Sequence, residues 1–278
     1  MKLLLAPLEG VSDCAFRTLC FNHGADITFT EMIRADSLVR KNKATLALLD
    51  LKNNVPTGIQ LLAIKPASAT AFVAMFSSFE FHTTPVQINL NCGCPSPDVI
   101  QQGGGAALVK RVQRLQELVT IFRKLSLPVT LKIRLGLNDY EKKNKTYLNL
   151  LKTVDADAFI VHARHARQSS REPADWNVFE ECIATGKYII PNGDISGREH
   201  ISYFQKLGIK EVMIGRAAVR NPSIFQYLNG KDKVSLPDLK EKYLALCEQF
   251  PNHPKYKENV LSYLGREEQS IHSKKWLM

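Results

Sequence analysis

The sequence contains no long apolar run, although 45% of its residues are hydrophobic. These residues occur in short stretches, of which residues 3–6 form the longest near the N-terminus. No window approaches the roughly 20 apolar residues of a transmembrane helix, and no secretory signal peptide is recognisable. We therefore expect a cytoplasmic protein with no membrane partner.

Cysteine is present, but without the spacing of a disulfide framework or a zinc site. Six cysteines are scattered irregularly along 278 residues, and Cys92 and Cys94 lack a second Cys or His pair at zinc-site spacing. Low-complexity tracts and internal repeats beyond strand–helix alternation are also missing from the sequence. We expect no metal site, and free thiols in a reducing compartment.

The charge balance is basic, with 37 Lys and Arg against 27 Asp and Glu and a formal net charge of +10. This excess favours a polyanionic partner such as a nucleic acid. Charge alone does not identify that partner, because many basic proteins are merely soluble.

Short apolar or β-rich runs recur along the chain, at residues 3–6, 27–30, 58–62, 86–90, 129–133, 158–161, 188–191 and 211–214. Segments with helical spacing lie between them, for example residues 106–122, where apolar residues recur at three- and four-residue intervals. This alternation and the chain length predict an α/β fold, a (β/α)8 TIM barrel. An open doubly wound sheet has the same periodicity and stays an alternative.

The alternation stops after Phe225. Pro237 then suits the first turn of a helix with Leu239, Tyr243 and Leu246 on one face. A second helix is expected from Tyr256 to about residue 264, with a possible continuation to residue 276. We therefore expect a barrel domain over residues 1–230 and a small C-terminal helical domain over residues 231–278.

Cys94 is a candidate catalytic thiol. It follows the apolar run 85–90 and lies between Gly93 and Pro95, before three consecutive glycines at residues 103–105. In a parallel barrel the loops after the strands build the reactive face, so a thiol on such a loop is held rigidly and partly exposed. A buried, inert cysteine is the alternative.

Polar residues occur at the end of each predicted strand. They are Glu9, Glu31, Gln60, Asn89, Asn91, Lys132, Arg134, His162, Arg164, Asn192, Asp194 and Arg216. A lysine beside a flavin ring would offset the negative charge of its reduced form, a glutamine can donate and accept at the ring edge, and the last two loops suit a phosphate. These residue types favour flavin mononucleotide (FMN), although each has an ordinary structural explanation when taken alone.

Several motifs resemble those of the tRNA-dihydrouridine synthases over residues 2 to about 228. They are APLEGVSD at residues 6–13, FTEM at 29–32, QL at 60–61, INLNCGCP at 88–95, GGGAAL at 103–108, LKIRLG at 131–136, VHAR at 161–164 with Gln168, PNGDI at 191–195 and IGR at 214–216. Fewer than about fifty residues remain after residue 230, whereas this family generally carries a larger helical RNA-binding domain.

The resemblance implies an FMN-dependent enzyme that takes hydride from NADPH and delivers it to C6 of a uracil ring in tRNA, while a cysteine protonates C5. Cys94 matches that acid and Cys92 does not, and a thiol of ordinary pKa is protonated at neutral pH. Asn91 and Arg164 are expected to contact the substrate. The expected cofactor-binding residues are Pro7, Leu8, Gln60, Lys132, His162, Asn192, Gly193, Asp194, Gly215 and Arg216.

The expected partner is tRNA, bound by a monomer, with the target uridine flipped out of its stack. Basic residues that could line the approach are Arg34, Arg40, Lys41, Lys43, Lys142, Lys143, Lys145, Arg164, Arg167 and Arg171. Lysines interleaved with aromatic residues also make the C-terminal segment a candidate RNA-docking element; they are Lys231, Lys233, Lys240, Lys242, Lys255, Lys257, Lys274 and Lys275, with Tyr243, Tyr256, Tyr263 and Trp276. A solvated basic face is the alternative for both sets.

Three other functions stay open. The same barrel could house a flavin oxidoreductase that acts on a free small molecule, and the RNA substrate could be ribosomal. A non-catalytic RNA-binding protein is the third possibility, against which the joint presence of Cys94, Lys132 and His162 argues.

Overall fold

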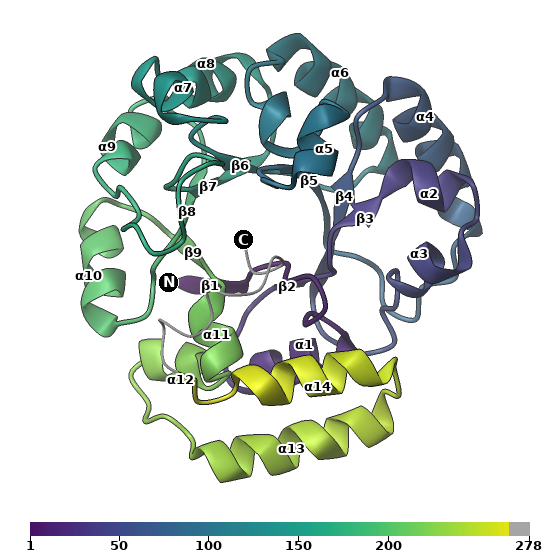
Figure 1. Cartoon of the computed structure of the whole chain (residues 1–278), viewed down its shortest axis with the longest axis vertical. Helices are drawn as coiled ribbons and strands as arrows, with labels where there is room; N and C mark the ends of the chain where they lie inside the picture. Colours follow the sequence, from purple (N-terminus) through teal and green to yellow (C-terminus); the bar gives the residue numbers. More distant parts are fainter. Residues whose placement is uncertain (267–278) are drawn as a thin grey trace.

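A computed structural model describes residues 1–266 of the chain. Nine parallel strands form one sheet, in the order β1-β9-β8-β7-β6-β5-β4-β2, with β3 also paired to β4. Figure 1 looks into the resulting barrel, which the helices surround. The strands are β1 (Lys2–Leu5), β2 (Thr28–Phe29), β3 (Ile33–Arg34), β4 (Thr57–Leu62), β5 (Gln87–Cys92), β6 (Val129–Arg134), β7 (Ala158–His162), β8 (Ile189–Asn192) and β9 (Glu211–Ile214).

The barrel closes between its first two strands. The amide of Leu5 donates to the carbonyl of Ile27 at 2.9 Å, and Leu4 bridges Ile27 in parallel. On the other side, β1 pairs with β9 over four residues. The predicted (β/α)8 barrel is therefore confirmed, and the open doubly wound sheet is excluded.

Every predicted strand is found, but the second is divided. We expected one strand over residues 27–30, whereas β2 ends at Phe29 and β3 begins at Ile33. The hydroxyl of Thr30 accepts a hydrogen bond from the backbone amide of Gln60 at 3.0 Å, and the carboxylate of Glu31 accepts one from the backbone amide of Gly10 at 2.7 Å. These side-chain hydrogen bonds interrupt the regular β pairing between β2 and β3.

Helices cover the outside of the barrel, and the longer ones bury an apolar face, as the expected three- and four-residue spacing requires. In α6, for example, Leu115, Leu118 and Phe122 are fully buried. The barrel helices are α1 (Cys14–Asn22), α2 (Ala35–Val39), α3 (Lys43–Ala47), α4 (Pro66–Met75), α5 (Pro97–Gln101), α6 (Val112–Phe122), α7 (Asp139–Lys143), α8 (Thr146–Thr153), α9 (Val178–Ile183), α10 (Arg198–Lys206), α11 (Arg216–Arg220) and α12 (Ile224–Leu228), with 3-10 turns η1 (Phe76–Ser78), η2 (Gly105–Leu108) and η3 (Arg123–Leu125).

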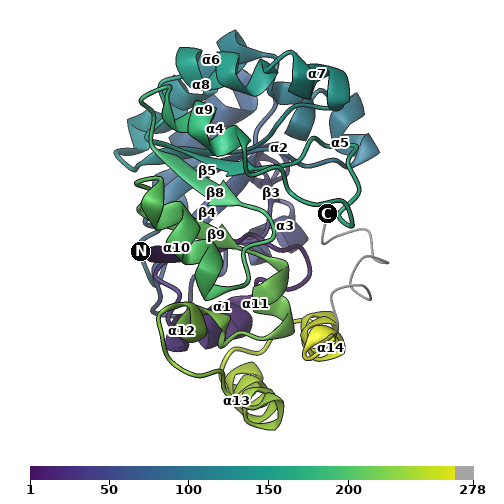
Figure 2. The same cartoon turned by 90° about the vertical axis from the view of Figure 1, so that its left-hand side faces the viewer.

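Two further helices, α13 (Leu236–Gln249) and α14 (Pro254–Tyr263), form a C-terminal tail. Helix α13 begins as expected, with Pro237 in its first turn and the Ser235 hydroxyl accepting the amide of Asp238 at 3.3 Å. It packs against α1, and α14 packs against α11. In the side view the tail lies along one flank of the barrel, with α14 toward the end that carries α5 and α11 (Figure 2).

The second predicted tail helix is present as α14, which ends at Tyr263 and does not continue through residues 264–266; the rest of the expected continuation to residue 276 lies outside the described residues. The expected domain boundary at residue 230 falls in the connection between α12 and α13. Within residues 1–266, none of the helices has the length and apolar character that crossing a membrane requires. All six cysteines lie in this range and are free.

Candidate active site

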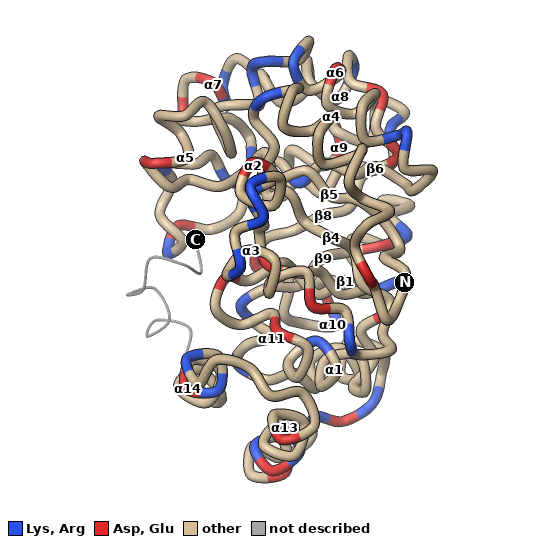
Figure 3. Tube along the Cα trace, turned by 90° about the vertical axis from the view of Figure 1, so that its right-hand side faces the viewer, with Lys and Arg blue, Asp and Glu red and all other residues tan. Residues whose placement is uncertain are grey.

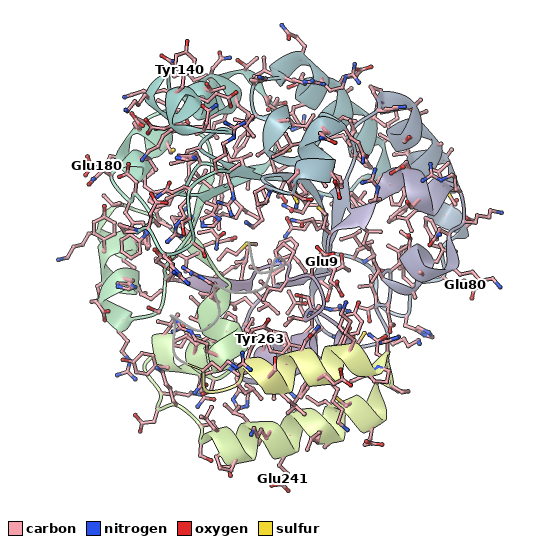
Figure 4. All side chains as sticks on the ribbon, in the orientation of Figure 1. Glu9, Glu80, Tyr140, Glu180, Glu241 and Tyr263 are labelled. Atoms are coloured by element: carbon pink, nitrogen blue, oxygen red, sulfur yellow. The ribbon has the colours of Figure 1, made fainter. Side chains whose placement is uncertain are left out.

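The carboxyl ends of the strands surround an open pocket. Side chains from many strands converge on this opening, and Glu9 lies at its edge (Figure 4). The pocket brings together all the residues that were expected in the site, namely Pro7, Leu8, Gln60, Asn91, Cys94, Lys132, His162, Arg164, Asn192, Gly193, Asp194, Gly215 and Arg216. Their individual roles stay predictions.

Cys94 lies in the loop after β5, and the side chain of Asn91 holds this loop in place. The Asn91 carbonyl oxygen accepts the amides of Gly93 at 3.2 Å and Cys94 at 2.9 Å. Burial raises the pKa of the Cys94 thiol, the Glu9 carboxylate raises it further, and the nearby cations Arg134 and Lys132 oppose that shift. The thiol is therefore protonated at neutral pH and partly exposed, as a proton donor must be.

Cys92, two residues earlier, has a different environment. Its side chain is fully buried in the hydrophobic core, and burial raises the pKa of its thiol well above the ordinary range. The end of β5 explains the difference, because Cys92 is the last residue of the strand and packs in the core with Ile88 and Leu90, whereas Cys94 lies in the loop beyond the strand. The two cysteines are thus a natural matched pair for experiment.

A chain of side-chain amides crosses the strands below Cys94. The amide nitrogen of Gln60 donates to Asn89 at 2.7 Å, and the amide nitrogen of Asn91 donates to the Gln60 carbonyl oxygen at 2.9 Å. Asn89 in turn donates to the hydroxyl of Thr130 at 2.8 Å. Mutual bonding fixes the orientation of Gln60 and Asn91, whose remaining hydrogen-bonding capacity faces the pocket.

Three cationic or basic side chains line the pocket from β6 and β7. Burial, with a smaller contribution from Arg134, lowers the pKa of Lys132 to about 7, and its ammonium donates to the Asn192 carbonyl oxygen at 3.0 Å. Burial likewise lowers the pKa of Arg134 to about 10. Burial and the surrounding cations lower the pKa of His162 well below its ordinary value, so this imidazole is neutral.

A carboxylate flanked by two arginines lies at the opposite side. Asp194 bonds Arg164 and Arg216 at 2.5 Å each. Burial alone would raise the pKa of Asp194, but hydrogen bonds from Arg164 and the amide of Ala174 and the charge of both arginines hold it below its ordinary value. The same arginines reach the β7–α9 loop, because Arg164 donates to the carbonyl of Glu172 and Arg216 to that of Ser170.

Arg164 was expected to contact substrate. Its side chain lines the pocket, but the residue is only 2% exposed and its guanidinium is already bonded to Asp194 and Glu172. In this conformation it shapes the pocket from within, and a direct contact with RNA stays a prediction. The other basic residues of the expected approach are at least partly exposed, although Lys142 and Lys143 form ion pairs with Asp175 and Asp139.

Gly193 is required by its surroundings. Its φ is +118°, and a Cβ there would lie 3.0 Å from the His162 ring and 3.1 Å from the Ala174 side chain. The Trp176 indole donates to its carbonyl at 3.0 Å. The backbone can therefore approach a ligand closely at this point.

Several lining residues were not assigned to the site from the sequence. Glu9, Met32 and Arg134 were noted only at strand ends or in motifs, whereas Ser170 and Met213 were not singled out. Glu9 and Arg134 adjoin assigned residues, so their position at strand ends was enough to predict that they line the pocket. Ser170 lies well beyond the end of β7, and only the folded loop returns it to the pocket.

Comparison with known proteins adds to this geometry. The family model described as dihydrouridine synthase (Dus) matches residues 4–277. A human tRNA-dihydrouridine(47) synthase-like protein is 31% identical over 229 residues, which cover 81% of this chain and 35% of that protein. The tRNA-dihydrouridine synthase B of Pseudomonas putida is 30% identical over 264 residues, covering 90% of this chain and 75% of the relative.

The chain thus spans about a third of the length of the human relative and three quarters of the bacterial one. Among solved structures, morphinone reductase is similar with a TM-score of 0.58 at 11% identity, covering 86% of this chain and 88% of that one. At such low identity this likeness supports the barrel fold alone.

Proposed function

Since the chain belongs to the dihydrouridine synthase family, we propose that it is an FMN-dependent oxidoreductase that reduces the C5–C6 double bond of a uridine in tRNA. NADPH is the proposed reductant. The observation that carries this proposal is the meeting, in one pocket, of the protonated thiol of Cys94 with the buried ammonium of Lys132. The first suits proton donation to carbon, and the second suits negative charge on a ring.

The residues present fit FMN. Lys132 can offset negative charge at one edge of the ring, the side-chain amide of Gln60 can donate and accept at its polar edge, and that of Asn91 can donate there. Gly193 permits close backbone approach, and Arg216 offers charge to a phosphate. When bound, the flavin would take a hydride from NADPH and pass it to C6 of the uracil ring.

The role of Cys94 is to deliver the proton that C5 needs when C6 receives the hydride. Its thiol is neutral before the reaction, and the thiolate that remains is stabilised by Lys132 and Arg134 until solvent returns a proton. Asn91 keeps the thiol in place through the two amide bonds of its loop. His162 stays neutral and accepts a hydrogen bond from Arg164 at 3.2 Å.

The substrate reaches this pocket only if the uridine leaves its stack, because the pyrimidine face must lie against the flavin. The rim near α2 and α3 is basic, with Arg34, Arg40, Lys41 and Lys43 against Asp36 (Figure 3). We propose that this rim and the tail contact the phosphates of tRNA.

We also propose that the chain acts as a monomer. Its free cysteines are consistent with a reducing, cytoplasmic environment, which we propose as its location.

The purified protein tests the proposal directly. It should be yellow, its flavin spectrum should bleach under NADPH, and incubation with unmodified tRNA should yield dihydrouridine detectable by mass spectrometry of nucleosides. Substrate binding should weaken steeply with salt. A flavoprotein that forms no dihydrouridine in tRNA, and whose NADPH oxidation is stimulated only by a small molecule in a salt-independent way, would favour the rival oxidoreductase.

A further inference from the structure

Gly10, in the loop after β1, is held on both sides by residues distant in the sequence. Its amide donates to the carboxylate of Glu31 at 2.7 Å, and its carbonyl accepts the side-chain amide of Asn259 at 3.0 Å. The hydroxyl of Tyr256 donates to the same Glu31 carboxylate. Tyr256 and Asn259 both lie on α14. We call these four residues the Gly10 anchor.

The anchored loop is a wall of the pocket. Its residues Pro7, Leu8 and Glu9 line the cavity directly before Gly10. Glu9 lies at the edge of the barrel opening that is nearest to α14 (Figure 4). Displacement of Gly10 would therefore move the side chains that meet the ligand.

The loop has little freedom around Gly10. Its φ is +71°, a conformation that favours glycine, and a Cβ there would lie 2.9 Å from the Asn259 amide nitrogen. Asn259 is 8% exposed, so its hydrogen bond is sheltered from water. The position of Gly10 is therefore coupled to that of α14.

Glu31 extends the same connection to a second wall. It is 6% exposed and immediately precedes Met32, which also lines the pocket. A buried carboxylate needs hydrogen-bond donors, and here Gly10 and Tyr256 supply them. Glu31 thus joins the loop after β1, the β2–β3 connection and the tail.

We propose that Glu31, Tyr256 and Asn259 are positioning residues that set the wall formed by residues 7–10, so that α14 is a part of the active-site architecture. The inference rests on the proposed function in one respect, because the ligand held by that wall is taken to be FMN. The tail then has a role in binding the cofactor that is separate from any contact with RNA.

Two mild substitutions test this role. Tyr256→Phe removes one hydroxyl, and Asn259→Leu removes the donor while keeping a similar volume. Tyr243→Phe is the control, because it removes a buried hydroxyl of the same tail that has no hydrogen-bond partner among the described residues. Hydrogen exchange of the FMN-free protein, resolved to single amides, reports on the wall without any activity measurement.

We expect both anchor variants to raise the exchange rates of residues 8–10 severalfold and to leave the amides of β6 unchanged. FMN should dissociate more readily, with an affinity about three- to tenfold lower, as befits one lost buried hydrogen bond. The kcat for RNA reduction should fall while the KM for RNA changes little. Tyr243→Phe should show none of these effects.

Unchanged exchange at residues 8–10 in both variants would overturn the inference, as would an equal rise at β6, which would indicate only a general loss of stability. If the unmodified protein binds no FMN and forms no dihydrouridine, the proposed function fails instead. The exchange comparison still decides the positioning role in that case, because it needs no cofactor.

Discussion

Two regions of this molecule bury ionisable groups whose pKa values shift in opposite directions. The pocket buries Lys132 and Arg134, whereas the contact between the tail and the barrel, here called the tail seam, buries Asp13 and Glu31. Burial opposes charge in both places, so the pKa values of the bases fall and those of the acids rise.

The difference lies in what compensates the burial. In the tail seam, backbone amides of the same chain donate to the acids, from Phe16 to Asp13 at 2.9 Å and from Gly10 to Glu31 at 2.7 Å. In the pocket, Lys132 donates to a neutral amide and faces an opening. The acids of the tail seam thus have hydrogen-bond donors within the chain. The cations of the pocket can instead stabilise a negatively charged ligand.

The largest effect should come from the thiol at the cationic pocket. We expect Cys94→Ala to slow the reduction of RNA by about 10²–10⁴-fold, the usual cost of a lost general acid, while flavin binding and NADPH oxidation stay nearly intact. Single-turnover kinetics with tRNA would measure this. Cys92→Ala, in the core beside it, should do far less; equal losses would remove Cys94 from its assigned role.

Substitution of Lys132, a cation of the pocket, should have the next largest effect. We expect Lys132→Met to weaken binding of the reduced flavin by about ten- to a hundredfold relative to the oxidised form, since a charged hydrogen bond is lost. Potentiometry would register this as a lower midpoint potential. An unchanged potential with unchanged flavin occupancy would place Lys132 outside the cofactor site.

The same variant has a pH signature. Because the pKa of Lys132 is lowered to about 7, its ammonium is charged below that pH and loses its proton above it. The difference in midpoint potential between Lys132→Met and the unmodified protein should therefore shrink from about pH 6 to about pH 9. A constant difference across this range would contradict the lowered pKa.

A smaller effect is expected on the acidic side. Burial raises the pKa of Asp13 from 3.8 to about 6, so the folded protein binds more protons than the unfolded chain between these values. Its stability should then decline as pH rises through that window. Asp13→Asn keeps a good helix N-cap and should remove this decline, with a gain of about 1–2 kcal/mol at pH 7.

Urea unfolding of both proteins at about pH 4 and about pH 7 would measure this gain. Arg17→Gln is a useful companion, since the charge of Arg17 lowers the pKa of Asp13 and its removal should steepen the decline. Equal pH dependence in Asp13→Asn and the unmodified protein would show that the seam carboxyl is not the cause.

The smallest effect concerns surface charge on the tail. We expect Lys255→Gln with Lys257→Gln to weaken tRNA binding severalfold and to reduce the salt slope by about one unit, without changing the flavin spectrum. Lys124 and Lys210 precede β6 and β9 at the opposite end of the barrel, so the same change there is the control. If both pairs of substitutions changed the tRNA affinity and its salt slope equally, the tail would be only a structural cap. Lys274 and Lys275, which were also expected to contact RNA, lie outside the described residues.

Prediction from sequence succeeded where the chain repeats a simple rule. Apolar runs of strand length alternate with amphipathic helices, and parallel strands in a barrel bring their carboxyl ends together, so Gln60, Lys132 and His162 could be grouped from order alone. The division of β2 from β3 was missed because it depends on hydrogen bonds of Thr30 and Glu31 to distant backbone, which leave no periodic signal.

Contacts of long sequence separation were beyond the same reasoning. Asn259 reaches Gly10 across 249 residues, and nothing in either local sequence indicates the partner. The tail was therefore considered only as a candidate RNA-docking element, for its lysines and the aromatic residues between them, whereas its structure also offers a polar contact with the barrel. Likewise, Arg216 donates a hydrogen bond to the backbone carbonyl of Ser170 and so holds Ser170 at the pocket. A contact to a backbone carbonyl cannot be predicted from the residue type.

The pairing of β1 with β9 has a consequence for how this protein is made. Lys2 lies opposite Glu211 in the sheet, so the edge of the first strand has no partner on that side until more than two hundred residues have left the ribosome. Such distant pairing slows folding. The hydrogen bond from Asn259 to Gly10 forms later still, so the wall of the pocket formed by residues 7–10 is complete only after residue 259 has left the ribosome.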